Sequence, residues 1–130
     1  MDYSKLSDFE INKRVAIANG LLVQEIDDSK ATGMTSKYHE LRPHTVWVSD
    51  GQNPWEQYAP TLCWEDAGPI ILNNRISLVW DCAEDASSEW WNAVDQFDEC
   101  RVQYQSNPLR GAMIVFLMLR EQANVQDNPA

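Results

Sequence analysis

Basic residues are scarce in this sequence. It contains 10 Lys and Arg against 20 Asp and Glu, a formal net charge of −10, and no Lys or Arg occurs between Ile76 and Cys100. Proteins that bind DNA, RNA or an anionic membrane surface through their charge need clustered positive side chains. We therefore expect neither direct nucleic-acid binding nor membrane binding.

Residue patterns that signal a metal site or a catalytic site are also missing. The two histidines, His39 and His44, lie in a polar stretch, and the sequence has no Cys-x-x-Cys pair and no Gly-rich phosphate loop. Adjacent carboxylates such as Glu65-Asp66 diverge on a helix or a strand, so they do not form an acid/base couple. We expect a non-enzymatic protein with no metal and no other cofactor.

Long apolar segments and an even set of cysteines are absent as well. The longest apolar run, 111–119, is about half the length that spans a bilayer. Cys63, Cys82 and Cys100 are odd in number and widely spaced, which favours free thiols in a reducing cytosol. The first residues are polar and do not form the apolar core of a signal peptide. These features predict a cytosolic protein.

The patterns that are present predict one α+β domain over residues 1–130. A capping box, Ser7-x-x-Glu10, and a helix-ending Gly20 predict a helix over about 8–19. Asn107-Pro108 is typical of a helix start and predicts a C-terminal helix. Strands are expected at 21–26, 45–49 and 75–80, with a last hairpin formed by 90–97 and 101–105. The order indicates a small antiparallel sheet packed against an N-terminal, a short central and a C-terminal helix.

Three further segments complete this expected architecture. The polar stretch 28–44 is predicted to be a mobile loop, because loops of that length are usually functional or mobile. The short central helix is expected within 60–73, where Pro69 suits the start of a fresh turn better than a helix interior. Residues 123–130 are expected to form a frayed tail.

The C-terminal helix carries more apolar side chains than one small sheet can cover. Its apolar residues follow a helical stripe, and others lie outside that stripe. We therefore expect a second subunit to cover part of the helix, which predicts a homo-oligomer. The expected interface residues are Met113, Phe116, Leu117 and Met118.

The stretch from Tyr58 to Ile71 combines aromatic, acidic and conformationally restricted residues. Tyr58, Trp64 and Trp47 offer aromatic faces that stack on planar ligands, and Asp66 offers a hydrogen-bond acceptor. Arg75 is the one base between Arg42 and Arg101. These five residues form the expected ligand-binding site. In the alternative interpretation Trp64 is a core residue, and Arg75 only forms a clamp with Asp66 or Glu65.

The base-free segment is the expected protein-partner surface. It either faces a basic partner or serves as a solvated face that maintains solubility. Its seven acidic residues are Asp81, Glu84, Asp85, Glu89, Asp95, Asp98 and Glu99.

Three segments of the chain resemble a known family. The pattern Tyr58-x-Pro60-Thr61-x-x-Trp64-x-x-x-Gly68-Pro69-Ile70-Ile71, followed by Arg75-Ile76, resembles the central motif of the NinX-like proteins of tailed bacteriophages. The opening residues 1–12 and the segment 107–115 are similar to the two ends of the same family. The members are small accessory proteins of lambda-like phages. The resemblance implies a viral protein in the host bacterial cytoplasm and supplies no catalytic residues.

Phage accessory proteins often act against host defences, and this association suggests three hypotheses. In the first, the protein binds and sequesters a host nucleotide-type signal at the expected ligand site. In the second, it is an acidic inhibitor or nucleic-acid mimic that blocks a basic host protein through the segment 81–99. In the third, it has a replication or structural accessory role.

Overall fold

The protein is an α+β structure with two small sheets separated by helices. A computed structural model describes residues 2–26 and 45–127. Its elements in order are η1 (Tyr3–Lys5), α1 (Asp8–Ala18), β1 (Leu22–Ile26), β2 (Thr45–Ser49), β3 (Glu56–Gln57), α3 (Trp64–Asn73), β4 (Ser77–Cys82), β5 (Glu89–Val94), β6 (Arg101–Gln105) and α4 (Pro108–Asp127). The predicted α+β class is therefore confirmed, although the single expected sheet is divided into two.

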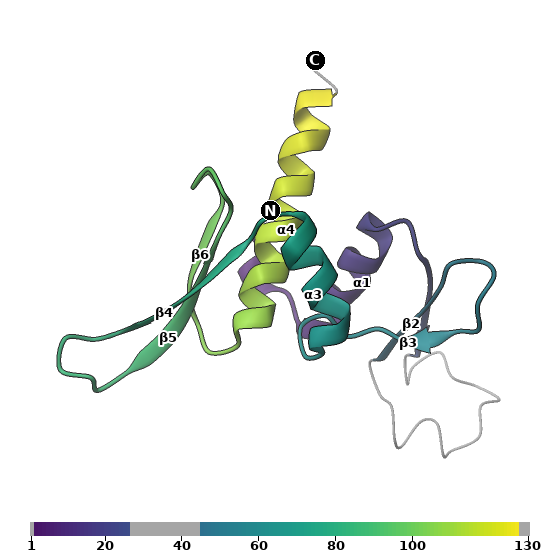
Figure 1. Cartoon of the computed structure of the whole chain (residues 1–130). Helices are drawn as coiled ribbons and strands as arrows, with labels where there is room; N and C mark the ends of the chain where they lie inside the picture. The colour runs from purple at the N-terminus through teal and green to yellow at the C-terminus, as the bar shows by residue number, and fades with distance from the viewer. Residues whose placement is uncertain (1, 27–44, 128–130) are drawn as a thin grey trace.

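Each sheet has three antiparallel strands, and each is built from consecutive strands. One has the order β1-β2-β3 and the other the order β4-β5-β6. Figure 1 shows the two sheets on opposite sides of the helices, with α4 beside the β4-β5-β6 sheet and α1 beside the other sheet. The one hairpin predicted from the sequence, β5 with β6, forms, and β3 is a strand that the sequence did not predict. The helices lie between the two sheets and prevent one continuous sheet.

Helix α4 forms the centre of the core. Residues 111–117 are all buried, and the helix contacts α1, α3, β5 and β6. Gly111 permits the close approach of the sheet, because a Cβ at this position would lie 3.2 Å from Cγ of Gln105 and 3.5 Å from Cβ of Ala93. The apolar perimeter of α4 is thus covered on several sides by its own chain.

This packing corrects the expected oligomer interface. Met113, Phe116 and Leu117 are at most 5% exposed within the single chain, and only Met118 is half-buried. The sequence predicted one sheet as the cover for this helix, but α1 and α3 also pack against α4 from elsewhere in the chain.

The local signals that begin and end helices are confirmed. The Ser7 hydroxyl accepts a hydrogen bond from the Glu10 amide at 3.2 Å, and Gly20 has a positive φ of 77° after α1. The Asn107 side chain accepts a hydrogen bond from the Leu109 amide at 2.9 Å at the start of α4. The strand 45–49 matches its prediction, with Val46 and Val48 buried.

Other boundaries differ from the predictions. Helix α3 runs through Pro69 without ending there, so this proline is interior and no fresh turn begins. Strand β4 begins two residues later than expected, at Ser77, because Arg75 adopts a left-handed φ of 53° after α3. Helix α4 continues to Asp127 and so occupies most of the expected tail. The expected mobile loop, 28–44, lies outside the described residues.

A buried polar network joins three distant parts of the chain. The Asn12 side chain, on α1, accepts a hydrogen bond from the Thr61 amide at 3.0 Å. The Asn107 side chain donates to the Thr61 carbonyl at 2.6 Å while its oxygen caps α4. Both hydrogen-bonding groups of the Thr61 backbone are thereby satisfied inside the protein, which is required of buried peptide groups.

We predict that Asn12→Ala destabilises the protein by about 1–3 kcal/mol, because it leaves the Thr61 amide buried without an acceptor. Urea denaturation measures the effect. The control is Asn124→Ala, which changes an exposed asparagine on α4 and should leave the unfolding free energy nearly unchanged. Equal midpoints for the two variants would show that the Thr61 network contributes no stability.

Candidate functional site

The exposed position of Trp64 excludes a core role for this residue. Trp64 is the first residue of α3 and is 59% exposed. Gly68 lies one helical turn after Trp64, and the Trp64 indole lies beside it. A Cβ at position 68 would be 3.4 Å from Trp64 Nε1, so the absence of a side chain there leaves space for the indole. The alternative interpretation of Trp64 as a core residue is therefore wrong.

Trp64, Arg75 and Trp47 do not line the cavity that contains Tyr58 and Asp66. Arg75 is exposed beyond the C-terminal end of α3, and within the described residues it forms no ion pair with Asp66 or Glu65. The proposed clamp is thus not present. Trp47 lies on β2, on the face opposite Val46 and Val48, and its Nε1 donates to the Thr45 hydroxyl at 3.1 Å.

Tyr58 and Asp66 are brought together, as the sequence predicted. They line a cavity of about 420 Å³ between the end of α1 and α3. Asp66 Oδ2 accepts a hydrogen bond from the Ala59 amide at 3.0 Å, which orients the carboxylate. The Asn19 side chain donates to the Tyr58 hydroxyl at 3.5 Å. Asn73, Asn74 and Glu65 add further polar groups to the lining.

The environment of Tyr58 keeps its hydroxyl protonated. Burial raises the pKa of Tyr58 to about 12. The hydrogen bond from Asn19 acts against this rise, and the negative charge of Asp66 adds to it. At neutral pH the Tyr58 hydroxyl is thus a neutral donor and acceptor beside a carboxylate.

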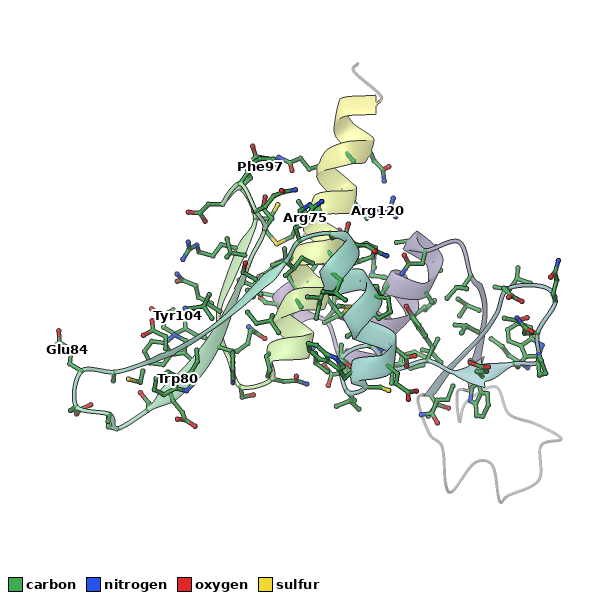
Figure 2. The ribbon with its side chains drawn as sticks, viewed as in Figure 1. Arg75, Trp80, Glu84, Phe97, Tyr104 and Arg120 are labelled. Atoms are coloured by element: carbon green, nitrogen blue, oxygen red, sulfur yellow. The ribbon has the colours of Figure 1, made fainter. Side chains whose placement is uncertain are left out.

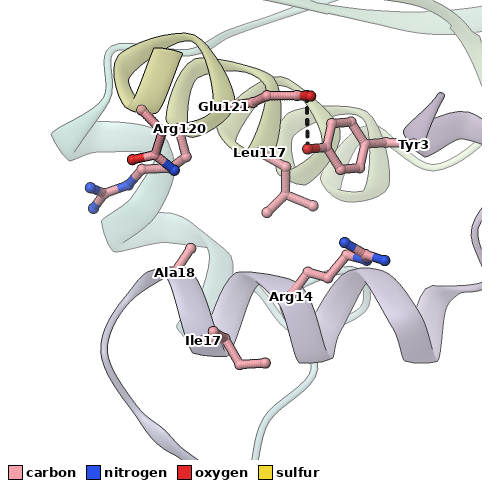
Figure 3. A pocket seen from close by; sticks show the side chains of 8 residues that line it. Tyr3, Arg14, Ile17, Ala18, Leu117, Arg120 and Glu121 are labelled. Atoms are coloured by element: carbon pink, nitrogen blue, oxygen red, sulfur yellow. Dashed lines mark hydrogen bonds between the residues drawn. The ribbon is translucent and has the colours of Figure 1, made fainter. Parts of the chain in front are cut away.

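A second cavity, which the sequence did not predict, lies between α1 and α4. Its volume is about 620 Å³, and Figure 3 shows its lining. Arg14 and Arg120 lie at its two ends, and Leu117 lies between them. The Tyr3 hydroxyl donates to Glu121 Oε2 at 2.9 Å across the cavity. The full lining comprises Tyr3, Arg14, Ile17, Ala18, Leu117, Arg120, Glu121 and Asn124.

Both arginines of this second cavity have a distinctive environment. Arg14 Nε is buried and has no hydrogen-bond acceptor among the described residues. The Arg120 guanidinium lies 5.3 Å from the centre of the Phe116 ring, a cation–π arrangement. Arg120 also lines the cavity that contains Tyr58 and Asp66. The two cavities therefore adjoin at Arg120, and we refer to them together as the Arg120 cleft.

Sequence reasoning missed Arg14 and Arg120 because each lies in a helix where a base is ordinary. A signal existed in the spacing of the lining residues. Leu117, Arg120, Glu121 and Asn124 recur at helical spacing and define one stripe of α4. Only the packing of α1 against α4 shows that this stripe faces Arg14.

One of the seven expected partner residues is structural. Asp95 is 5% exposed, and its carboxylate accepts hydrogen bonds from the amides of Phe97, Glu99 and Cys100 at 2.7–3.2 Å. Burial acts to raise the pKa of Asp95, but these amide donors outweigh it and the pKa is lowered. We therefore remove Asp95 from the expected partner surface. The other six acids are exposed.

No three His, Cys, Asp or Glu side chains among the described residues are arranged to hold a metal ion. His39 and His44 lie outside that part of the chain. In the same described part, no helix is both long enough and apolar enough to cross a membrane.

Comparison with known families identifies the relatives of this chain. A family model described as "Bacteriophage P22, NinX" matches residues 2–120. The chain belongs to this family. No curated protein matches the sequence. The matched range contains Arg14, Tyr58, Asp66 and Arg120, and it contains all three segments that the Thr61 network joins. Membership of the NinX family makes this a phage protein and fits an accessory role.

We predict that Trp64→Ala lowers the unfolding free energy by about 1 kcal/mol or less, because the side chain is largely exposed. Replacement of a buried Trp costs about 3–5 kcal/mol. Urea denaturation compares it with Ile70→Ala, which removes a buried side chain of the same helix and is expected to cost about 2–5 kcal/mol. A loss for Trp64→Ala as large as that for Ile70→Ala would contradict the exposed position.

We predict that the free energy of unfolding falls as pH rises from 10 to about 12, because Tyr58 ionises in the unfolded chain before it ionises in the folded protein. The folded state binds this proton more tightly than the unfolded chain, so the contribution of Tyr58 is complete below pH 10 and is lost as pH rises toward 12. Tyr58→Phe should make the fall in unfolding free energy shallower over this range. Tyr104→Phe, at an exposed tyrosine, is the control. Equal slopes for the two variants would contradict the assignment.

Proposed function

We propose that this NinX-family protein is a non-enzymatic counter-defence factor that sequesters an anionic, nucleotide-type signal of the host in the Arg120 cleft. The observation that carries the proposal is the position of Arg120, which lines both adjoining cavities. One cavity supplies cationic groups, and the other supplies hydrogen-bonding groups and an aromatic ring. A nucleotide combines the two kinds of group that complement these cavities.

The cationic part of the cleft suits a phosphate. Guanidinium groups bind phosphate oxygens through charge-assisted hydrogen bonds, often two at a time. Arg14 Nε is a buried donor without an acceptor in the described chain, and a donor left in that state costs free energy. A ligand oxygen at Arg14 removes this cost. Because Arg14 and Arg120 lie at opposite ends of their cavity, a ligand with more than one phosphate fits better than one with a single phosphate.

The polar part of the cleft suits a nucleobase or ribose. Asp66 and Glu65 accept hydrogen bonds from amino groups, imino groups or ribose hydroxyls. The amide side chains of Asn19, Asn73 and Asn74 both donate and accept, as base edges require. A carboxylate held by the Ala59 amide is already oriented, so less conformational entropy is lost when the ligand binds.

Part of the overall charge of −10 lies away from the cleft. Six exposed acids lie in the segment 81–99, on the other side of α4 from α1. Salt screens charges separated by more than about 8–10 Å at physiological ionic strength. A phosphate in the cleft therefore interacts mainly with the charged groups that line it, which are Arg14, Arg120, Glu121, Glu65 and Asp66.

We predict that one or more members of a panel of mono-, di- and cyclic nucleotides bind the full chain in isothermal titration calorimetry. Arg120→Gln should weaken binding about tenfold or more, because a charge-assisted hydrogen bond contributes about 1.5–3 kcal/mol. Asp66→Asn should change the preference among bases more than the affinity for phosphate.

Arg75→Gln is the matched control, since it removes one exposed positive charge outside the cleft. It should leave the affinity unchanged. Equal losses in Arg120→Gln and Arg75→Gln would indicate general charge attraction and contradict a site at Arg120. Native mass spectrometry of protein purified from a defence-carrying host supplies the second test. Absence of any bound nucleotide there, together with a silent panel, would refute sequestration.

A further inference from the structure

The β4-β5-β6 sheet forms an arm whose outer part extends beyond the helices. We define the β4–β6 arm as residues 77–105. Its inner part packs on α4, where Ala93 and Gln105 lie closest to Gly111. Figure 2 shows Trp80 and Glu84 on the outer part, away from the helices, whereas Tyr104 on β6 also lines a cavity with Ile114 and Met118 of α4. The inner part therefore packs against the core, and the outer part does not.

Large aromatic side chains cover both faces of this outer part. Trp80 is paired with Trp91 across β4 and β5, and Trp80 is 52% exposed. On the opposite face, the ring centres of Trp90 and Tyr104 are 5.1 Å apart, and Tyr104 is 70% exposed. Soluble proteins rarely leave several such side chains together in solvent unless the surface binds something.

The position of Tyr104 depends on an irregularity in the sheet. The pairing of β5 with β6 shifts between Trp91 and Ala93, and Tyr104 has a positive φ of 61°. A tyrosine rarely adopts this conformation, and such bulges often redirect a side chain next to a functional surface. The buried Asn92 accepts a hydrogen bond from the Tyr104 amide at 3.3 Å and fixes the bulge.

The charge around these aromatics is of one sign. Asp81, Glu84, Asp85 and Glu89 are exposed at the same end of the arm, in β4, in the turn and at the start of β5. No Lys or Arg occurs between Ile76 and Cys100. The nearest following base, Arg101, is at the inner end of β6 and is paired with Asp98 at 2.9 Å.

We propose that the outer part of the β4–β6 arm binds a Lys/Arg-rich segment of another protein. Cationic side chains are attracted to the faces of Trp and Tyr rings, and their alkyl stems pack on the same rings. The surrounding carboxylates complement the charge of such a segment and favour its approach. A second copy of this chain would bring like charges together at the same surface, which disfavours a symmetric dimer there.

The proposal concerns a different surface from the Arg120 cleft, and its test is independent of nucleotide binding. The probe is a fluorescein-labelled Lys/Arg-rich peptide, with a counterpart in which every basic residue is replaced by Glu. Fluorescence anisotropy with the full chain should show binding of the basic peptide that weakens as salt increases, and no binding of the acidic peptide.

Two matched variants locate the binding surface. Glu84→Gln/Glu89→Gln should weaken binding of the basic peptide about fivefold, whereas Glu10→Gln/Glu56→Gln removes the same charge elsewhere and should leave it unchanged. Trp80→Thr keeps the charge and a strand-forming residue, and it should also weaken binding about fivefold. Arg120→Gln should bind the peptide as wild type does, which separates this test from that of the cleft.

Three results would overturn the proposal. The first is that the wild-type protein does not bind the basic peptide at low salt. The second is that both Glu double variants weaken binding equally, which would show only general attraction to an acidic protein. The third is a dimer in analytical ultracentrifugation that Trp80→Thr dissociates, which would make the surface a self-contact. Thermal melts of each variant show whether it is folded. If Trp80→Thr unfolds, the comparison of Glu84→Gln/Glu89→Gln with Glu10→Gln/Glu56→Gln still decides the test.

Discussion

The two hydrogen bonds that hold the Thr61 backbone determine how the other parts of the protein are placed. One comes from α1 through Asn12, and the other comes through Asn107 from the residue that caps α4. A backbone N–H and a backbone C=O buried in the core each need a partner, so α1, the central segment and the start of α4 must meet at this point.

Arg110 reinforces the same junction from the surface side. Its guanidinium forms an ion pair with Asp8 at 2.6 Å and donates to the carbonyls of Ser4 and Leu6. These contacts attach the N-terminal residues to the first turn of α4. They thereby place the Tyr3 hydroxyl to donate to Glu121, which lies on α4 more than two turns beyond its first turn. The cavity between α1 and α4 thus depends on contacts made at a distance from it.

The architecture separates two surfaces of opposite character. The Arg120 cleft lies among the helices and contains two arginines, whereas the outer part of the β4–β6 arm is acidic and aromatic. Helix α4 lines one side of the cleft and lies between α1 and the β4-β5-β6 sheet (Figure 1). The chain therefore carries an arginine-containing cleft and an acidic, aromatic surface at different places, even though its net charge is strongly negative. A composition argument applied to the whole chain does not detect this separation.

The sequence by itself determined the local structure and the family. Capping residues, Gly20 and alternating strands depend on neighbours within a few positions, so α1, β2, the start of α4 and the last hairpin follow directly from the chain. The pairing of Tyr58 with Asp66 is also local, since a single turn and the start of α3 bring them together.

Tertiary structure decided the rest. It divided the strands into two sheets, enclosed Met113, Phe116 and Leu117 in the core, and separated Arg75 from Asp66. It also placed Arg14 beside a helix that begins more than ninety residues later. Contacts at such sequence separations depend on how whole helices pack, and periodicity shows which face of a helix is apolar but not which segment will cover it.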